Sequence, residues 1–128
     1  MINKEELGKV YGEGELIVRE GDDGDCMYVI QSGRVEILLE RPEGTTRLAI
    51  LETGDVFGEM ALFTQEPRSA TVRAFDQARV LTVDKRGFLK RMHQDPSLAF
   101  YILKKMSQRI KNLDKEIAHL KSLLSKQQ

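Results

Sequence analysis

The sequence contains few of the residues that build disulfides and metal sites. It has one cysteine, Cys26, and two histidines, His93 and His119, among 128 residues. A single cysteine excludes an intrachain disulfide, and a metal site needs a cluster of ligands that these residues do not supply. We interpret Cys26 as a buried, inert thiol in an apolar run. Both histidines are interpreted as surface or structural residues, and no metal is expected.

The sequence also lacks a basic excess and a long apolar run. Twenty lysines and arginines balance twenty acidic residues, whereas nucleic-acid binders usually carry an excess of positive charge. No run approaches the roughly 18–20 apolar residues that cross a bilayer, and the N-terminus has no signal-peptide core. We therefore expect a cytoplasmic protein with no membrane partner and no direct DNA binding.

The first three quarters of the chain show a pattern of short strands and turns. Runs rich in β-forming residues alternate with turns rich in glycine and acidic residues, at residues 15–19, 26–31, 34–40, 46–52, 69–75 and 78–84. Strands of this length between such turns predict a mainly β domain, a sandwich or a barrel.

Two details of this β region are specific enough to test. In residues 34–40, one face of a half-buried strand is expected to carry Val35, Ile37 and Leu39 toward the core. The other face would carry Leu38 with its acidic neighbours Glu36 and Glu40. Gly33 and Gly44 are expected in hairpin positions that require a positive φ.

Helices are predicted after Asp84. Residues 85–94 form a candidate short helix, and Asp95 and Pro96 then supply an N-cap and a first helical position. Neither glycine nor proline interrupts the chain from there to about Ser125, which predicts a helix about 45 Å long at 1.5 Å per residue. We expect a β domain with its N-terminal segment and short helix at residues 1–94, and the long helix at residues 95–128.

The long helix carries a heptad seam. Its apolar residues are spaced alternately by three and four, with isoleucine at two a positions and leucine at two of three d positions, which favours a parallel two-stranded coil. This predicts a homodimer whose seam is Leu103, Met106, Ile110, Leu113, Ile117, Leu120 and Leu124.

The residues flanking the seam agree with a parallel pair. Arg109 would face Asp114 of the second chain, and Glu116 would face Lys121, so both pairs are opposite in sign. The alternatives are a hetero-coil, a crossed packing, or packing of the stripe on its own β domain. Part of the stripe is expected to pack there, namely Phe100, Ile102 and Leu103.

One segment stands out as a candidate binding site, FGEMALFTQEPRSATVRA at residues 57–74. Gly58 permits a close backbone approach, and the first amides of a short helix from about Glu59 can bind an anion or a hydroxyl. Arg68 offers a planar fork suited to phosphate, and Ser69 and Ala70 add donors in a small space. From these residues alone, a phosphate-and-sugar clamp and an internal Glu59–Arg68 salt bridge remain equally good interpretations.

The segment closely resembles the phosphate-binding cassette of cyclic nucleotide-binding domains. Residues 58–62 and 67–70 carry the resemblance, and residues 14–37 resemble the family's first strands and glycine turns. The family includes bacterial cyclic AMP receptor proteins, protein kinase A regulatory subunits and cyclic nucleotide-gated channels. The resemblance implies an eight-stranded β-roll, or jelly roll, flanked by helices, with a long C-terminal dimerisation helix and no enzymatic activity.

The resemblance also assigns roles to residues of this chain. Glu59 would accept from the ribose 2′-OH, Gly58 would contact the ribose, Arg68 would pair with the cyclic phosphate, and Ser69 and Ala70 would add hydrogen bonds. Met60 and Ala61 complete the expected ligand-binding set.

The sequence departs from the bacterial receptors in two respects. Those proteins continue into a helix-turn-helix domain, whereas this sequence ends at Gln128 with no candidate recognition helix. They also place hydroxyl side chains against the adenine, where this chain has Leu113 and Asp114 next to Asn112. These three residues are possible base contacts, and cyclic AMP is the expected ligand, with cyclic GMP the alternative.

Three functional hypotheses follow. The first is a sensor that binds a cyclic nucleotide and signals to an unknown downstream protein by rearranging its C-helices in a dimer. The second is a non-binding scaffold that dimerises through its coil. The third is the excised sensor part of a larger regulator or channel.

Overall fold

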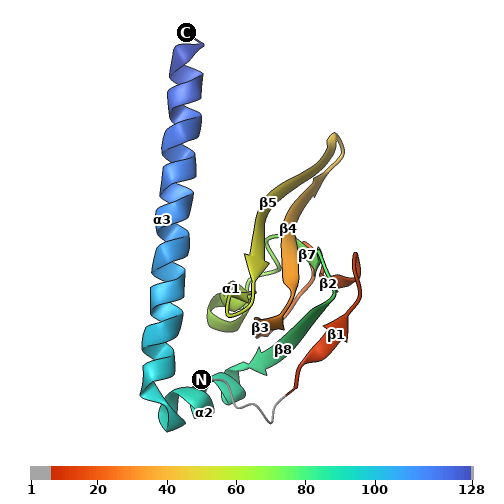
Figure 1. Cartoon of the computed structure of the whole chain (residues 1–128), viewed down its shortest axis with the longest axis vertical. Helices are drawn as coiled ribbons and strands as arrows, with labels where there is room; N and C mark the ends of the chain where they lie inside the picture. The colour runs from red at the N-terminus through yellow and green to blue at the C-terminus, as the bar shows by residue number, and fades with distance from the viewer. Residues whose placement is uncertain (1–6, 128) are drawn as a thin grey trace. The chain divides into compact units, whose positions relative to one another are not determined.

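The computed structural model describes residues 7–127, so the ends of the predicted N-terminal segment and C-helix, residues 1–6 and 128, lie outside it. The chain divides into two compact units, Met1–Arg91 and Met92–Gln128. The first holds the β domain, one short helix and most of a second, and the second unit is dominated by one long helix (Figure 1).

The β unit is built from two four-stranded antiparallel sheets. The first sheet has the order β1-β8-β3-β6 and the second has the order β2-β7-β4-β5. The eight strands of the described residues are β1 (Lys9–Tyr11), β2 (Leu16–Val18), β3 (Cys26–Ser32), β4 (Arg34–Arg41), β5 (Gly44–Glu52), β6 (Val56–Phe57), β7 (Thr71–Ala74) and β8 (Ala78–Asp84). This confirms the predicted eight-stranded β-roll.

The main core lies between the two sheets, and every strand contributes to it. Its members are Tyr11, Val18, Ile30, Val35, Ile37, Leu51, Phe57, Val72, Ala74, Ala78 and Val80. A second apolar cluster lies on the other face of the first sheet and consists of Met27, Val29, Val56, Leu62, Leu81 and Val83, with Phe88 packed against it. The first sheet is therefore apolar on both faces, and two short helices supply part of its outer cover.

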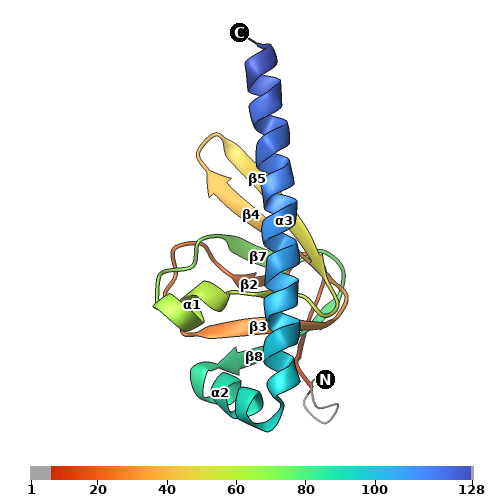
Figure 2. The same cartoon turned by 90° about the vertical axis from the view of Figure 1, so that its left-hand side faces the viewer.

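Those helices are α1 (Glu59–Thr64) and α2 (Lys85–Gln94). Both were predicted, and both are confirmed. Leu62 of α1 and Phe88 of α2 reach the cluster on the first sheet, and α1 lies beside β3 (Figure 2). The ring of Phe63 packs edge-on against Phe88, with 5.5 Å between the centroids.

The six predicted strands all form, although several boundaries differ by one or two residues. The strands β1 and β6 were not predicted. They have three and two residues, too few to show a repeating pattern. Each pairs with a longer strand of the first sheet, β1 with β8 and β6 with β3, so pairing rather than local propensity stabilises them.

The predicted alternation in β4 is only partly correct. Leu38 was expected to face away from the core, but it is only 2% exposed, and Glu36 is buried as well. The register with β5 shifts between Ile37 and Leu38, as in a β-bulge, which interrupts a ladder. The buried negative charge of Glu36 is paired with Arg73, whose Nε donates to Oε2 of Glu36 at 2.7 Å.

The hairpin glycines are confirmed. Gly33 has φ 80° between β3 and β4, and Gly44 has φ 141° where β5 begins. A Cβ on Gly33 would also collide with the backbone of Gln77.

The second unit contains α3 (Pro96–Lys126), which spans 31 residues and confirms the predicted long helix. Asp95 is its N-cap, and the backbone N–H of Ser97 donates to Oδ1 of Asp95 at 3.2 Å. Pro96 occupies the first turn, where its missing N–H costs nothing.

Burial along α3 differs from the expected pattern near its start. Ile102 is buried as predicted, but Phe100 and Leu103 are 72% and 62% exposed. Leu98 is the other buried residue, and it shares a helical face with Ile102, four positions later. Phe100 projects from the opposite side, which explains its exposure.

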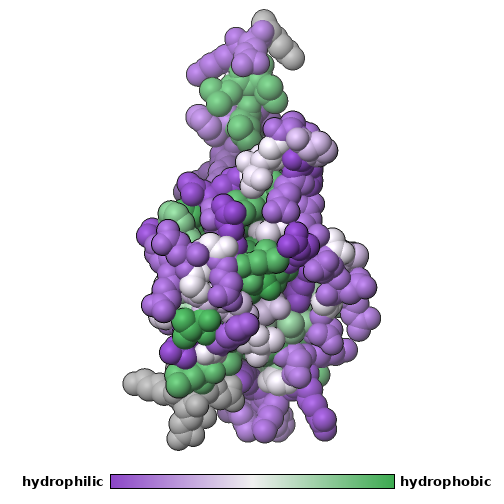
Figure 3. Space-filling view, turned by 90° about the vertical axis from the view of Figure 1, so that its right-hand side faces the viewer, coloured by the Kyte–Doolittle hydropathy of each residue, from purple (hydrophilic) through white to green (hydrophobic). Residues whose placement is uncertain are grey.

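The predicted seam is a continuous apolar stripe that the single chain leaves mostly exposed. Its six leucine and isoleucine members are each at least 47% exposed. Figure 3 shows apolar side chains gathered near the C-terminal end of α3. Within residues 7–127, no helix combines the length and hydropathy that a membrane span needs.

The N-cap gives a first testable prediction. Replacing Asp95 with alanine should lower the free energy of unfolding by about 1 kcal/mol, because an orphan amide of α3 loses its acceptor. Urea titration followed by circular dichroism measures this. Asp95→Asn keeps a side-chain oxygen and should cost much less; equal losses for the two variants would contradict the capping role.

Candidate functional site

The candidate segment begins where β6 ends. Gly58 is the N-cap of α1 and has φ 77°, in the left-handed region that favours glycine. A Cβ at this position would lie 2.7 Å from Nη1 of Arg68 and 3.2 Å from the Tyr28 ring. The prediction that Gly58 permits a close approach is therefore confirmed, and the group that approaches is the Arg68 guanidinium.

Arg68 is the most deeply placed charged residue of the segment, with only 8% of its surface exposed. Its Nη1 donates to the backbone carbonyls of Cys26 at 2.9 Å and Gly58 at 3.1 Å. Its Nη2 donates to the Cys26 Sγ at 3.4 Å. Arg68 thus bonds to carbonyl oxygens and a thiol, whereas the salt-bridge alternative required the Glu59 carboxylate as its acceptor.

Two further residues complete the surroundings of this guanidinium. The Tyr28 ring lies 5.4 Å from its Cζ, within cation–π range, and stacks on Phe57 of the core. Gly24 also lies against the guanidinium, because a Cβ there would overlap it. We call Gly24, Cys26, Tyr28 and Gly58 the Arg68 cradle.

The cradle also affects the protonation of Tyr28. Burial, followed by hydrogen bonding with Cys26, raises the pKa of Tyr28 to about 12. The phenol therefore stays neutral at physiological pH.

Backbone hydrogen bonds fix the loop that carries Arg68. The Arg68 N–H donates to the Asp22 carbonyl at 2.9 Å, and the Gly21 N–H donates to the Arg68 carbonyl at 2.8 Å. Nearby, the Glu20 N–H donates to Oγ1 of Thr71 at 3.0 Å. The β2–β3 loop and the segment before β7 therefore hold each other in place.

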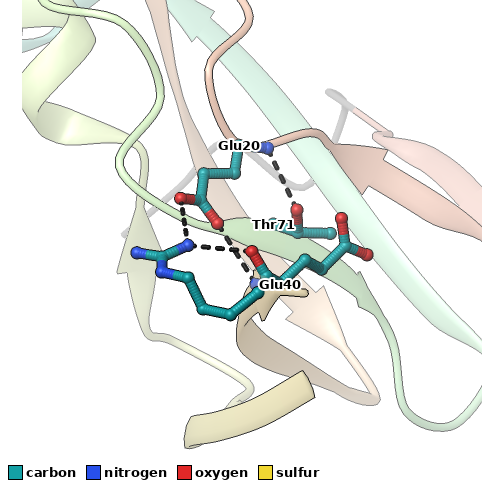
Figure 4. Close-up of polar contacts among 4 residues, drawn as sticks. Glu20, Glu40 and Thr71 are labelled. Carbon is teal, nitrogen blue, oxygen red and sulfur yellow. Dashed lines mark hydrogen bonds and ion pairs between the residues drawn. The ribbon is translucent and has the colours of Figure 1, made fainter. Parts of the chain in front are cut away.

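The side chain of Glu20 extends this network to β4 (Figure 4). Nη1 of Arg41 lies 2.7 Å from its Oε2, and the Glu40 N–H donates to its Oε1 at 3.2 Å. The hydrogen bond from Arg41, with a smaller contribution from Glu40, lowers the pKa of the Glu20 carboxyl below its ordinary value of 4.5.

This lowered pKa predicts a pH dependence. A carboxyl whose pKa is lower in the folded state stabilises the fold above its unfolded pKa, and the stabilisation is lost as the pH falls through the folded value. Glu20→Gln should therefore lower the thermal midpoint at neutral pH, with a difference from wild type that shrinks below about pH 4. Thermal unfolding across pH tests this, with exposed Glu13→Gln as the control. A pH-independent difference would contradict it.

The structure brings part of the predicted site together. Gly58 and Arg68 are in direct contact, and Glu59 and Ala70 are partly buried beside them in the chain. Ala61 is buried, whereas Met60 and Ser69 are exposed. Asn112, Leu113 and Asp114 lie exposed on α3, in the second unit.

The sequence interpretation missed three of the cradle's contributions. Cys26 was expected to be buried and inert, but it is only partly buried. Its shorter hydrogen bond with Arg68 is made by its backbone carbonyl, which every residue type has, so the sequence could not reveal it. Tyr28 was interpreted only as a strand residue, and Gly24 only as a turn residue. Their nearness to Arg68 depends on the pairing of distant loops.

No group of three or more potential metal ligands occurs in the part of the chain that the structure describes. His93 and His119 are exposed there, as predicted. The site offers instead a buried cation, a left-handed glycine and a short helix, which suit an anionic ligand.

The family model of the cyclic nucleotide-binding domain matches residues 8–95, well over half of the chain. The chain belongs to this family. The matched region contains both sheets, α1, α2 and the Arg68 cradle.

Several curated proteins resemble this cyclic nucleotide-binding domain. It is 41% identical over 80 residues to a cAMP-dependent protein kinase regulatory subunit of Debaryomyces hansenii, covering 62% of this chain and 17% of the relative. It is 26% identical over 111 residues to a CRP-like cAMP-activated global transcriptional regulator of Mycobacterium tuberculosis, covering 86% and 50%. The chain thus spans half or less of these relatives.

Several solved structures also resemble this chain. The Thermus thermophilus catabolite activator protein superimposes with a TM-score of 0.73 at 28% identity, covering 88% of this chain and 54% of that one. An EAL enzyme in its cGMP-bound form gives a TM-score of 0.60 at 35% identity, covering 80% and 27%. The same enzyme in its cAMP-bound form gives 0.61 at 32%, covering 91% and 32%.

Proposed function

We propose that this domain is a regulatory module that binds a cyclic nucleotide, with cyclic AMP as the first candidate and no reaction catalysed. The observation that carries the proposal is the buried Arg68 guanidinium, held by two backbone carbonyls inside the region that the family model matches. A cation placed so deeply is costly without an anionic partner or several acceptors.

The guanidinium retains donors for such a ligand. Arginine has five N–H donors, and its contacts with the described residues use three. Nε and the second N–H of Nη2 remain for two oxygens of a cyclic phosphate. Hydrogen bonds between two charged partners are roughly twice as strong as neutral ones. The contact with the phosphate would therefore account for most of the binding free energy that Arg68 contributes.

Residues around Arg68 would hold the sugar and close the site. We assign the ribose 2′-OH to Glu59 and the ribose backbone contact to Gly58, where the first amides of α1 also begin. Ser69 and Ala70 would donate to the phosphate, with Met60 and Ala61 beside them. The base would meet Asn112, Leu113 or Asp114.

The choice of cyclic AMP rests on the names of relatives. The kinase regulatory subunits and the mycobacterial regulator are described as cAMP-dependent or cAMP-activated. The EAL enzyme is described in both cAMP-bound and cGMP-bound forms, so cyclic GMP is the competing ligand.

The output of the module would be carried by α3. We propose that two chains pair through the exposed seam as parallel helices, and that the ligand changes their arrangement, which a partner protein detects. Such a switch requires that the ligand bind the two arrangements with different affinity.

The direct test is to identify the ligand. Purified protein is denatured by heat, the released small molecules are identified by mass spectrometry, and the stripped protein is titrated with cyclic AMP and cyclic GMP by calorimetry. We expect one site per chain. A stripped, folded protein that binds neither nucleotide would favour the scaffold function and refute the proposal.

A further inference from the structure

We infer that Gly24 is a positioning residue for ligand binding: its lack of a side chain keeps two donor atoms of Arg68 available to an anion. The inference rests on the proposed cyclic nucleotide site and adds to it a residue from the β2–β3 loop. Gly24 lies between the acidic residues Asp23 and Asp25, in a loop interpreted from sequence only as a turn.

The geometry at Gly24 differs from that at the left-handed glycines. Its φ lies outside the positive range, so the backbone conformation is one that alanine adopts. A Cβ at this position would nevertheless overlap Nε, Nη2 and Cζ of Arg68, far inside the 3.0 Å that real Cβ atoms keep from their neighbours. The requirement for glycine here comes from the arginine and not from the backbone.

The atoms involved matter for binding. Nη1 of Arg68 is occupied by the carbonyls of Cys26 and Gly58. Nε and Nη2 carry the N–H groups that remain for a ligand, and these are the two nitrogens that a methyl group on residue 24 would displace. Moving the guanidinium away from such a methyl group would strain the hydrogen bonds from Nη1 to the carbonyls of Cys26 and Gly58.

Alanine at position 24 should therefore weaken the binding of the phosphate and leave the fold intact. We expect Gly24→Ala to raise the dissociation constant for cyclic AMP about tenfold, part of the effect of losing a charge-assisted contact. Gly24→Val should raise it further. Gly12→Ala is the matched control, because Gly12 has an ordinary φ and nothing within 4 Å of its Cβ position.

A double-mutant cycle separates this role from a general effect on the loop. Coupled residues give non-additive changes, so Gly24→Ala should cost little further affinity when Arg68 is already alanine. The readouts are calorimetric titration of the full chain with cyclic AMP and the NMR signal of the Arg68 Nε–H without ligand. That signal should shift in Gly24→Ala and not in Gly12→Ala.

The outcomes are distinguishable. If Arg68→Ala weakens binding and Gly24→Ala does not, the role of Gly24 is wrong and the proposed function stands. Equal losses with and without Arg68 would also refute it, as would an unchanged Nε–H signal. If the wild type binds no cyclic nucleotide, both proposals fail.

Discussion

Arg68→Ala is expected to weaken the binding of cyclic AMP by roughly 1.5–3 kcal/mol, the scale of hydrogen bonds to a charged group. This corresponds to an increase of about 10- to 150-fold in the dissociation constant. The loss is large because Arg68 is buried beside the proposed phosphate position, where water replaces its charge poorly. Calorimetric titration of both proteins, stripped of ligand, measures the change.

The controls distinguish a lost ligand contact from a damaged fold. Arg47→Ala removes an arginine that is half exposed and 3.9 Å from Glu36, so it should bind cyclic AMP like the wild type. Arg68→Lys keeps the charge but loses the planar fork. Its affinity for cyclic AMP should lie between those of Arg68→Ala and Arg47→Ala. Unchanged affinity in Arg68→Ala would refute the phosphate role, whereas unfolding would assign Arg68 to the support of its loop.

Leu113→Lys is expected to convert a dimer into a monomer. Leu113 occupies a d position of the seam and is 47% exposed in the single chain, so a lysine there is well solvated in the monomer. In a paired coil its ammonium would be buried without a partner, which costs about 3–5 kcal/mol. The dimer dissociation constant should rise by about 100-fold or more, as sedimentation velocity over a range of concentrations can show.

Two further variants locate the interface. Leu120→Lys is at the next d position, away from the proposed base contacts, and should have the same effect. His119→Lys adds the same charge at an exposed c position and should leave the dimer intact. A dimer that persists in both seam variants would place the interface elsewhere, and a monomeric wild type would refute the dimer proposal.

The sequence predicted the longer elements well, because each of them carries its own repeating pattern. The capped start of α3 at Asp95 and the six predicted strands follow from local residue types and periodicity. The strands β1 and β6 depend on pairing with β8 and β3, which no local pattern reveals. Leu38 lies at a register shift between β4 and β5, and the sequence of β4 alone does not reveal a shift that depends on how two strands pair.

The candidate site was predictable to the extent that side chains define it. The run from Gly58 to Ala70 contains a glycine, a helix start and an arginine, and the contact between Gly58 and Arg68 is present in the structure. The Cys26 carbonyl that accepts from Arg68 and the room left by the missing side chain of Gly24 are features of the backbone. They cannot be predicted until the β2–β3 loop is placed against Arg68.

The central claim is that a cyclic nucleotide occupies the site around Arg68, and NMR spectroscopy tests it most directly. Stripped, isotopically labelled protein is titrated with cyclic AMP while the amides of residues 58–61 and 68–70 and the Arg68 Nε–H are followed. We predict that these signals shift together and saturate with one dissociation constant. Unchanged signals at these residues with millimolar cyclic AMP and cyclic GMP would mean a binding free energy weaker than about −4 kcal/mol and would contradict the account.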